Sequence, residues 1–134
     1  MIEGSCLCGS VRYRIESPLG EAHHCHCGMC RKAHGAAFST FARSAKDSLH
    51  VDDPHLHLKW YRSSEHIARG FCGECGSSLF FTFAPLADAI WVTLGTVDGD
   101  PGVRPDAHIF VGSKAEWDRI ADDLARYEEY PPFE

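Results

Sequence analysis

The sequence predicts a mainly β fold made of short strands, on three observations. Apolar and polar side chains alternate in several segments, as they do along a strand with one buried face. Clusters of Gly, Pro, Ser and Asp separate these segments and indicate turns. Seven cysteines occur in closely spaced groups. Because the chain has 134 residues and neither an internal repeat nor a linker, we expect residues 1–134 to form a single domain.

The alternation is clearest from Ser10 to Glu16. Val11, Tyr13 and Ile15 share one side of an extended chain there and charged residues occupy the other, so we expect a half-buried strand. Other runs are rich in aliphatic and aromatic residues and have the same character. We expect further strands over Ala36 to Ala42, Leu49 to Val51, Leu56 to Arg62, Leu79 to Phe83, Ala89 to Val97 and His108 to Val111.

Helical structure is expected in two places. One short helical turn fits Cys30 to His34, where Gly35 would end it. Near the C-terminus, the segment from Ser113 to Glu116 fits a capping box. The apolar residues that follow have helical spacing: Trp117, Ile120 and Leu124. The pattern therefore predicts a short C-terminal helix.

The composition argues against several classes of protein. The chain carries 13 basic and 19 acidic residues, a formal charge of −6, which disfavours nonspecific binding to nucleic acid or to an anionic membrane. No apolar run follows a basic N-terminus, and none approaches the roughly 20 residues of a membrane-spanning helix. We therefore expect a cytoplasmic protein that binds neither nucleic acid nor membrane.

The cysteine spacing favours metal binding over disulfides. Seven is an odd number, and a pair separated by one residue, such as Cys6 and Cys8 or Cys25 and Cys27, makes a strained local disulfide. In a reducing cytosol, closely spaced cysteines more often hold a metal ion. We therefore interpret the cysteines as metal ligands.

Three thiols fall within the six residues from Cys25 to Cys30. Gly28 lets the backbone turn tightly enough for the three sulfurs, those of Cys25, Cys27 and Cys30, to point at one centre. Zinc binds thiolates and takes four ligands in closed structural sites, so three protein ligands leave a place open, as in catalytic zinc sites. This cluster is the candidate catalytic zinc centre.

The other four cysteines form two pairs. Cys6 and Cys8 would point to the same face of a strand end, and Cys72 and Cys75 belong to a turn with glycines that is typical of a zinc knuckle. We expect these four to form a closed structural site, which gives two zinc ions per chain. A partition that moves one of them to the three-thiol cluster is also possible but breaks a pair.

The electrostatics of the open site favour an anionic guest. A zinc ion with three thiolates carries a charge of −1 and can still accept a small thiol as its thiolate. Arg31 and Lys32 follow the cluster directly and could hold carboxylates of such a ligand. We therefore expect Arg31 and Lys32 to contact substrate.

The cysteine motifs and the sequence around them resemble those of the glutathione-dependent formaldehyde-activating enzyme family. The match includes the tail near His108 and extends over nearly the whole chain. The matching segments are Gly4 to Gly9 with Val11 and Tyr13, Cys25 to Lys32 with Gly35, Phe71 to Ser77, His108 to Phe110, Ser113, Lys114 and Trp117.

The resemblance implies a fold of several coiled antiparallel sheets, the Mss4-like or β-tent arrangement. It implies a structural zinc at the paired cysteines, a catalytic zinc at the three-thiol cluster, and a carbon–sulfur lyase activity. The reaction joins formaldehyde and glutathione as S-(hydroxymethyl)glutathione. Because the resemblance includes His108, we also consider this residue as an acid–base or substrate-binding group. The partners would be glutathione or another small thiol and a small aldehyde, in a monomer or homodimer.

Other functions compete with this hypothesis. A histidine near the cluster (His23, His24, His26 or His34) could close the second zinc site, which would then be structural. The protein would in that case be a noncatalytic zinc module, a thiol carrier or a protein-interaction domain. A redox enzyme of the methionine sulfoxide reductase type needs a cysteine spared from metal, and the division into four and three spares none.

Overall fold

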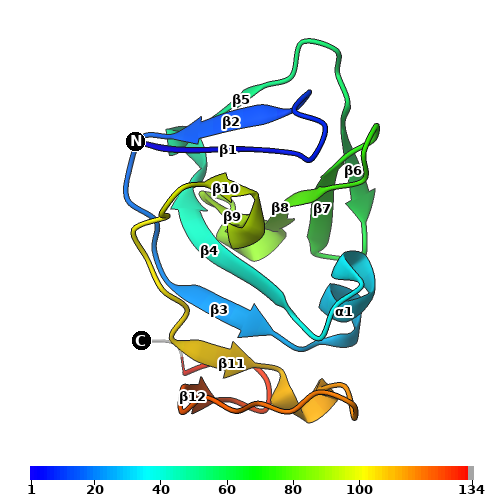
Figure 1. Cartoon of the computed structure of the whole chain (residues 1–134), viewed down its shortest axis with the longest axis vertical. Coiled ribbons are helices and arrows are strands. Elements are labelled where there is room, and N and C mark those ends of the chain that lie inside the picture. Colours follow the sequence, from blue (N-terminus) through cyan, green and yellow to red (C-terminus); the bar gives the residue numbers. More distant parts are fainter. Residues whose placement is uncertain (133–134) are drawn as a thin grey trace.

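The computed structural model describes residues 1–132 and contains two β-sheets (Figure 1). The smaller sheet has the strand order β10-β1-β2-β5, with β1 Ile2–Ser5, β2 Arg12–Ile15, β5 Leu49–Asp52 and β10 Val97–Asp98. The larger sheet has the order β12-β11-β3-β4-β9-β8-β7-β6, with β3 Ala22–Cys25, β4 Ser39–Ala45, β6 Leu58–Arg62, β7 Ile67–Cys72, β8 Ser78–Phe83, β9 Ala89–Thr93, β11 Ala107–Ile109 and β12 Ala125–Arg126.

Helices are few and short in the described part of the chain. The one α-helix, α1, covers Gly28–His34 and thus begins two residues before the predicted turn. It ends at Gly35, which has the left-handed conformation, and this end was predicted. Four single 3₁₀ turns cover Lys46–Ser48, Ala84–Leu86, Leu94–Thr96 and Val111–Ser113. None of these helices is long enough to cross a bilayer.

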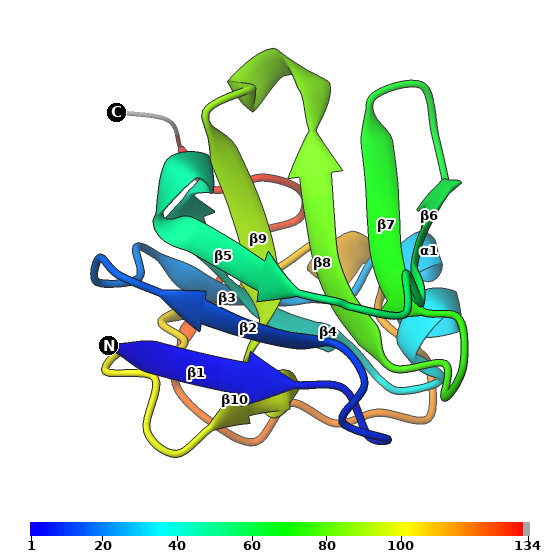
Figure 2. The same cartoon turned by 90° about the horizontal axis from the view of Figure 1, so that it is seen from above.

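The two sheets cross steeply and enclose a common core. In Figure 2 the strands of the smaller sheet run across β8 and β9 of the larger one. The strand pairs are antiparallel except at β11, which is parallel to both β3 and β12. A mainly β fold of antiparallel sheets is therefore confirmed, with a parallel edge added near the C-terminus.

The first predicted strand shows how the sequence builds this core. Val11, Tyr13 and Ile15 are buried, while the charged residues between them are exposed. They pack with Leu79 and Phe80 from the larger sheet in one apolar cluster. This cluster also contains Cys6 and Cys72, so the core and the paired cysteines are assembled together.

The strand predicted over Ala89 to Val97 is wrong in its second half. It stops at Thr93, makes a 3₁₀ turn over Leu94–Thr96, and continues as β10 in the other sheet. The Thr96 hydroxyl donates to the Thr93 carbonyl (2.9 Å) and stabilises this turn. The chain thereby passes from the larger sheet to the smaller one.

Tyr13 is packed across Gly4, and only a glycine fits there. A Cβ at Gly4 would lie on the Tyr13 ring and 2.6 Å from the Thr96 carbonyl oxygen. The Tyr13 hydroxyl bonds to the Thr96 hydroxyl (2.8 Å) inside the core. Burial raises the pKa of the Tyr13 phenol to about 12. The neutral phenol is therefore the form that the fold stabilises.

We expect Tyr13 to make stability depend on pH in the alkaline range. The pKa of Tyr13 is about 12 in the folded protein and near 10 in the unfolded chain. The stabilisation from the neutral phenol is therefore fully present below pH 10 and is lost as the pH rises through 12, a change of about 3 kcal/mol in total. Urea unfolding of the wild type and Tyr13→Phe, each between pH 8 and pH 12, tests this. The difference in the free energy of unfolding between the two proteins must change with pH in that range, and a difference that is independent of pH would contradict the expectation.

The predicted C-terminal helix is wrong. Residues 114–132 contain no helix, and Trp117, which was to lie on its apolar side, is 74% exposed. Instead, this segment pairs with the edge of the larger sheet: Tyr127 donates to the His108 carbonyl (2.9 Å) and Val111 donates to the Tyr127 carbonyl (3.1 Å). Hydrogen bonds to β11 thus replace those of a local helix, because they also cover the edge of the sheet.

Candidate metal centres

The structure brings together the two predicted cysteine pairs. The sulfurs of Cys6, Cys8, Cys72 and Cys75 all lie within 4.8 Å of one another. Those of Cys6 and Cys8 are 3.6 Å apart, and those of Cys8 and Cys72 are 3.9 Å apart. A tetrahedral zinc site with its usual Zn–S bonds separates its sulfurs by about 3.8 Å. The four sulfurs therefore fit a zinc ion.

Hydrogen-bond donors surround these sulfurs. The backbone N–H groups of Val11 and Cys75 point at the sulfurs of Cys6 (3.3 Å) and Cys72 (3.5 Å). Hydroxyl groups lie beside the remaining two sulfurs, with Ser10 3.2 Å from Cys8 and Ser77 3.3 Å from Cys75. Such donors stabilise negative charge on sulfur, which is the form that binds metal.

The second cluster is built where β3 meets α1. Cys25 is the last residue of β3, Cys27 caps the N-terminus of α1, and Cys30 lies in the first turn of the helix. The Cys27 sulfur accepts the backbone N–H of Cys30 (3.3 Å), which holds the first helical turn around it. The three sulfurs lie within 4.8 Å of one another, so this cluster could also hold a metal ion.

The three-cysteine cluster is covered on one side and more accessible on the other. Cys25 and Cys30 are each 4% exposed, and Cys27 is only partly buried. Hydrogen bonds to Cys25 and Cys27 hold the pKa of the Cys30 thiol well below its usual value. An apolar surface adjoins the cluster, made by Phe41, Phe81, Phe83, Leu86, Trp91, Ile109, Phe110 and Tyr127.

Arg69 adds a positive charge to this site, and sequence analysis missed it. Its Nη2 lies 3.6 Å from the Cys30 sulfur, its Nε donates to the Ser63 hydroxyl (3.1 Å), and its guanidinium lies 6.0 Å from the centre of the Phe81 ring. Arg69 forms no ion pair with a carboxylate of the described residues. It comes from β7 and is 39 residues from Cys30 in sequence.

The predicted substrate residues Arg31 and Lys32 lie in the last turn of α1. Arg31 folds back towards the segment from Cys25 to Cys27, which we call the metal loop because it carries two of the candidate ligands, and its Nε donates to the His26 carbonyl (3.4 Å). Lys32 is exposed on the helix surface. Arg31 thus supports the loop that carries the cysteines, whereas Arg69 is the basic residue that lies against a cysteine sulfur.

The nearby histidines lie outside the three-cysteine cluster. Within residues 1–132, no His, Asp, Glu or further Cys offers a ligand atom to this group. His24 bonds to the Thr40 hydroxyl (2.7 Å), His26 bonds to His108, and His23 pairs with Asp106. The hypothesis of a site closed by histidine therefore finds no support in this arrangement.

His108 lies inside the protein and is 2% exposed. Its Nδ1 is 2.8 Å from Nε2 of His26, and its Nε2 is 2.9 Å from a carboxylate oxygen of Asp122. The hydrogen bond from His108 lowers the pKa of the Asp122 carboxyl, which is therefore ionised. Both ring nitrogens of His108 thus have partners in the protein.

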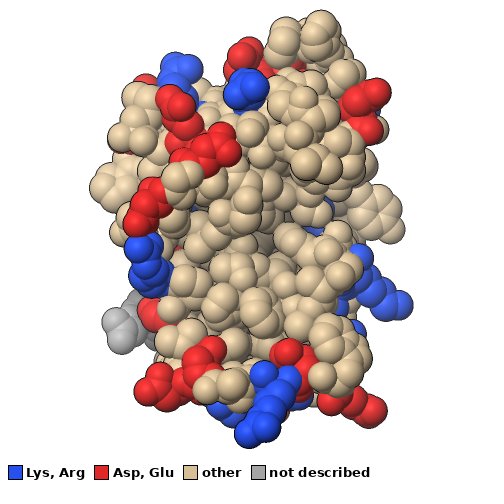
Figure 3. Space-filling view, in the orientation of Figure 1, with Lys and Arg blue, Asp and Glu red and all other residues tan. Residues whose placement is uncertain are grey.

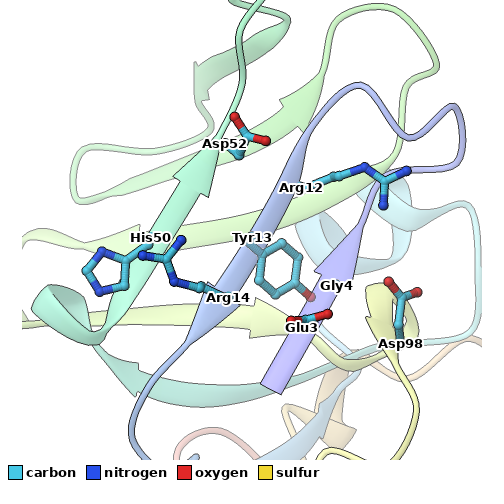
Figure 4. A pocket seen from close by; sticks show the side chains of 8 residues that line it. All are labelled: Glu3, Gly4, Arg12, Tyr13, Arg14, His50, Asp52 and Asp98. Atoms are coloured by element: carbon cyan, nitrogen blue, oxygen red, sulfur yellow. The ribbon is translucent and has the colours of Figure 1, made fainter. Parts of the chain in front are cut away.

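Two hollows lie away from the cysteine sulfurs. Figure 3 shows one face of the molecule hollowed near its centre, with uncharged residues around the hollow and the charged side chains towards the outer edge of the face. A hollow of about 450 Å³ is bordered by the end of α1 and by residues 76–78. A smaller one of about 200 Å³ lies on the smaller sheet, where the charged side chains of Figure 4 surround Tyr13. Neither hollow has a cysteine in its lining.

A family profile and two related proteins show which family the sequence is similar to. The profile of the glutathione-dependent formaldehyde-activating enzyme family matches residues 1–113. A protein of Halomonas elongata with the provisional name glutathione-dependent formaldehyde-activating enzyme is 28% identical over 128 residues, covering 90% of this chain and 81% of that protein. An uncharacterised lyase of Schizosaccharomyces pombe is 27% identical over 116 residues, covering 85% and 81%.

A solved structure supports the fold. The crystal structure of a Rhodobacter sphaeroides protein matches this one with a TM-score of 0.62 at 24% identity. The match covers 77% of this chain and 91% of that chain. The two proteins therefore share their architecture.

Proposed function

Because the chain belongs to the glutathione-dependent formaldehyde-activating enzyme family, we propose that it is a zinc-dependent carbon–sulfur lyase. Its substrate would be the adduct of glutathione, or a similar small thiol, with an aldehyde such as formaldehyde. The observation that carries the proposal is the three-cysteine cluster, which has no further protein ligand within residues 1–132 and an arginine against one sulfur.

The two cysteine clusters suit different tasks. The four-cysteine cluster offers a complete tetrahedral set and joins β1 to β7, which suits a structural role. At the three-cysteine cluster, a bound zinc would supply a Lewis acid that favours the thiolate form of a small thiol. The protein's own contribution is to hold and orient that thiol.

The reaction forms or breaks one carbon–sulfur bond. In the forward direction the thiolate sulfur adds to the aldehyde carbon, the electron pair of the C=O bond moves to oxygen, and that oxygen takes a proton. The reverse direction returns the proton and releases the thiolate. The apolar surface formed by Phe81, Phe110 and Tyr127 would keep water from the reacting groups.

Arg69 is the residue that we propose orients the thiol. Its guanidinium has donors left over after its contacts with Ser63 and Cys30, and it faces no carboxylate of the described chain. An arginine in this state suits a carboxylate of the ligand, since the planar group can bind both oxygens. Glutathione carries two carboxylates, so Arg69 would favour it over an uncharged thiol.

We expect Arg69→Met to raise KM for glutathione by about 10-fold or more, because one charge-assisted hydrogen bond contributes roughly 1.5–3 kcal/mol. An uncharged thiol such as 2-mercaptoethanol should lose much less. Arg43→Met is a matched control, because Arg43 also stacks on an aromatic ring, 5.8 Å from the centre of Trp91. Equal losses for the two thiols, or for the two variants, would contradict the role of Arg69.

The function itself is tested by exchange NMR spectroscopy. The exchange between free formaldehyde plus glutathione and their adduct should accelerate when the protein is added at catalytic concentration. Binding of glutathione without faster exchange would instead identify a thiol carrier, and no binding would identify an interaction module.

We also propose a cytoplasmic location, because a reducing compartment keeps seven metal-binding thiols unoxidised.

A further inference from the structure

A chain of hydrogen-bonded side chains leads from the surface to the back of the three-cysteine cluster. Asp122, whose side chain is 45% exposed, bonds to His108 (2.9 Å), and His108 bonds to His26 (2.8 Å). The two histidines are buried, with 2% and 0% exposure. His108 and Asp122 are 14 residues apart in sequence, and His26 and His108 are 82 residues apart. The fold therefore brings these three side chains together.

The end of this chain is a residue of the metal loop. His26 lies between Cys25 and Cys27, and its backbone N–H donates to the Ile109 carbonyl on β11 (2.9 Å). Its ring packs against Phe38, with the ring centres 5.0 Å apart. The loop that carries two cysteines is thus fixed to β11 both through its backbone and through an imidazole ring.

The carboxylate sets the direction of the hydrogen bonds. An ionised Asp122 only accepts, so the Nε2 of His108 must carry the hydrogen. With His108 neutral, its Nδ1 accepts from Nε2–H of His26, and the other nitrogen of His26 is left with a lone pair. That nitrogen, Nδ1, is buried without a hydrogen-bond partner among the described residues. Removing the carboxylate would remove the constraint on both rings.

We propose that Asp122 and His108 are positioning residues that hold the His26 ring, and with it Cys25 and Cys27, in the geometry that binds the metal of the three-cysteine centre. The inference rests on the proposed function only in treating this cluster as a metal centre. It assigns a role to His26 and His108, two buried histidines that the proposed thiol chemistry does not use. Partners of this outer kind commonly change metal affinity by 10- to 100-fold.

The test is the rate at which a chelator removes zinc from the folded protein. Zinc should leave the wild-type protein in two kinetic phases, one for each centre. The phase that is absent in Cys27→Ser is the one that reports on the three-cysteine centre. Asp122→Ala should accelerate that phase about 10-fold and leave the other phase unchanged. Asp122→Asn keeps an oxygen acceptor for His108 and should restore most of the wild-type rate.

Asp106→Ala is the matched control. Asp106 also pairs with a histidine of the same sheet edge, His23 (3.4 Å), but this pair does not reach the metal loop. Asp106→Ala should leave both phases of zinc release unchanged. A second readout is the visible spectrum of the cobalt-substituted protein, in which Asp122→Ala should alter the bands that Cys27→Ser removes.

Three outcomes would overturn the inference. Asp122→Ala could leave both phases and the cobalt spectrum unchanged, it could accelerate both phases equally together with a lower unfolding temperature, or Asp106→Ala could have the same effect. All three would leave the proposed function standing, because they do not depend on the lyase assay. A wild-type protein that binds only one metal ion would overturn both.

Discussion

Cys75→Ser is expected to leave the purified chain largely unfolded and unable to bind zinc at the four-cysteine cluster. Cys75 is partly exposed and packs only at the border of the apolar core cluster, so the substitution removes a metal ligand with little loss of core packing. Cys72 would be a poorer choice, because it is fully buried in the apolar cluster between the sheets. The effect of Cys75→Ser can therefore be assigned to the metal.

The size of the effect follows from two magnitudes. Structural zinc contributes roughly 10–16 kcal/mol of apparent binding free energy to small domains, whereas the whole net stability of a domain is about 5–15 kcal/mol. A zinc ion bound there would join cysteines of β7 and of the segment after β1, although Cys8 and Cys72 are 64 residues apart in sequence. Without it, the contact between the two sheets loses its strongest single link.

The measurement is near-ultraviolet circular dichroism with zinc analysis of the same sample. Cys8→Ser provides a second variant, because Cys8 is exposed and belongs to the other pair. Both variants should lose the near-ultraviolet signal and bind less than one zinc per chain. A folded Cys75→Ser protein with its zinc content unchanged would show that the four-cysteine cluster does not hold the fold together.

The sequence carried enough information for the cysteine clusters and most of the strands. Local spacing defines the triplet Cys25, Cys27 and Cys30 and the two pairs Cys6/Cys8 and Cys72/Cys75. That the two pairs meet was inferred from the four thiolates that a closed zinc site requires. The strand around Tyr13 was equally clear, since its burial alternates as the sequence does. Local patterns were sufficient wherever the structure is determined by neighbours in sequence.

Local patterns failed where distant partners decide. The spacing of Trp117 and Leu124 predicted a helix, but hydrogen bonds between Tyr127 and β11 produce an extended edge instead. Arg69 looks like any polar residue of an alternating strand, and only the pairing of β7 with β8 places it beside Cys30. His108 of β11 was considered as an acid–base or substrate-binding group, and its contact with Asp122 was not foreseen because Asp122 comes from the segment that was expected to be helical.

Cys27→Ser is expected to remove one zinc ion and nearly all lyase activity while the fold remains. Cys27 is the most accessible of the three cysteines and caps α1 through its side chain. Serine is a preferred N-cap residue, so the helix keeps its capping hydrogen bond after the substitution. What the variant lacks is the third thiolate, without which the cluster cannot hold its metal.

The expected zinc content falls from about two to about one per chain, and the exchange rate between glutathione and its formaldehyde adduct falls at least 100-fold, towards the uncatalysed value. Zinc analysis, exchange NMR and thermal unfolding of the same preparation check these expectations together. The comparison with Cys75→Ser is decisive, because the proposed division of tasks requires the two substitutions to fail in different ways. If Cys27→Ser unfolds as Cys75→Ser does, both centres are structural. If it stays active, the chemistry lies elsewhere in the protein.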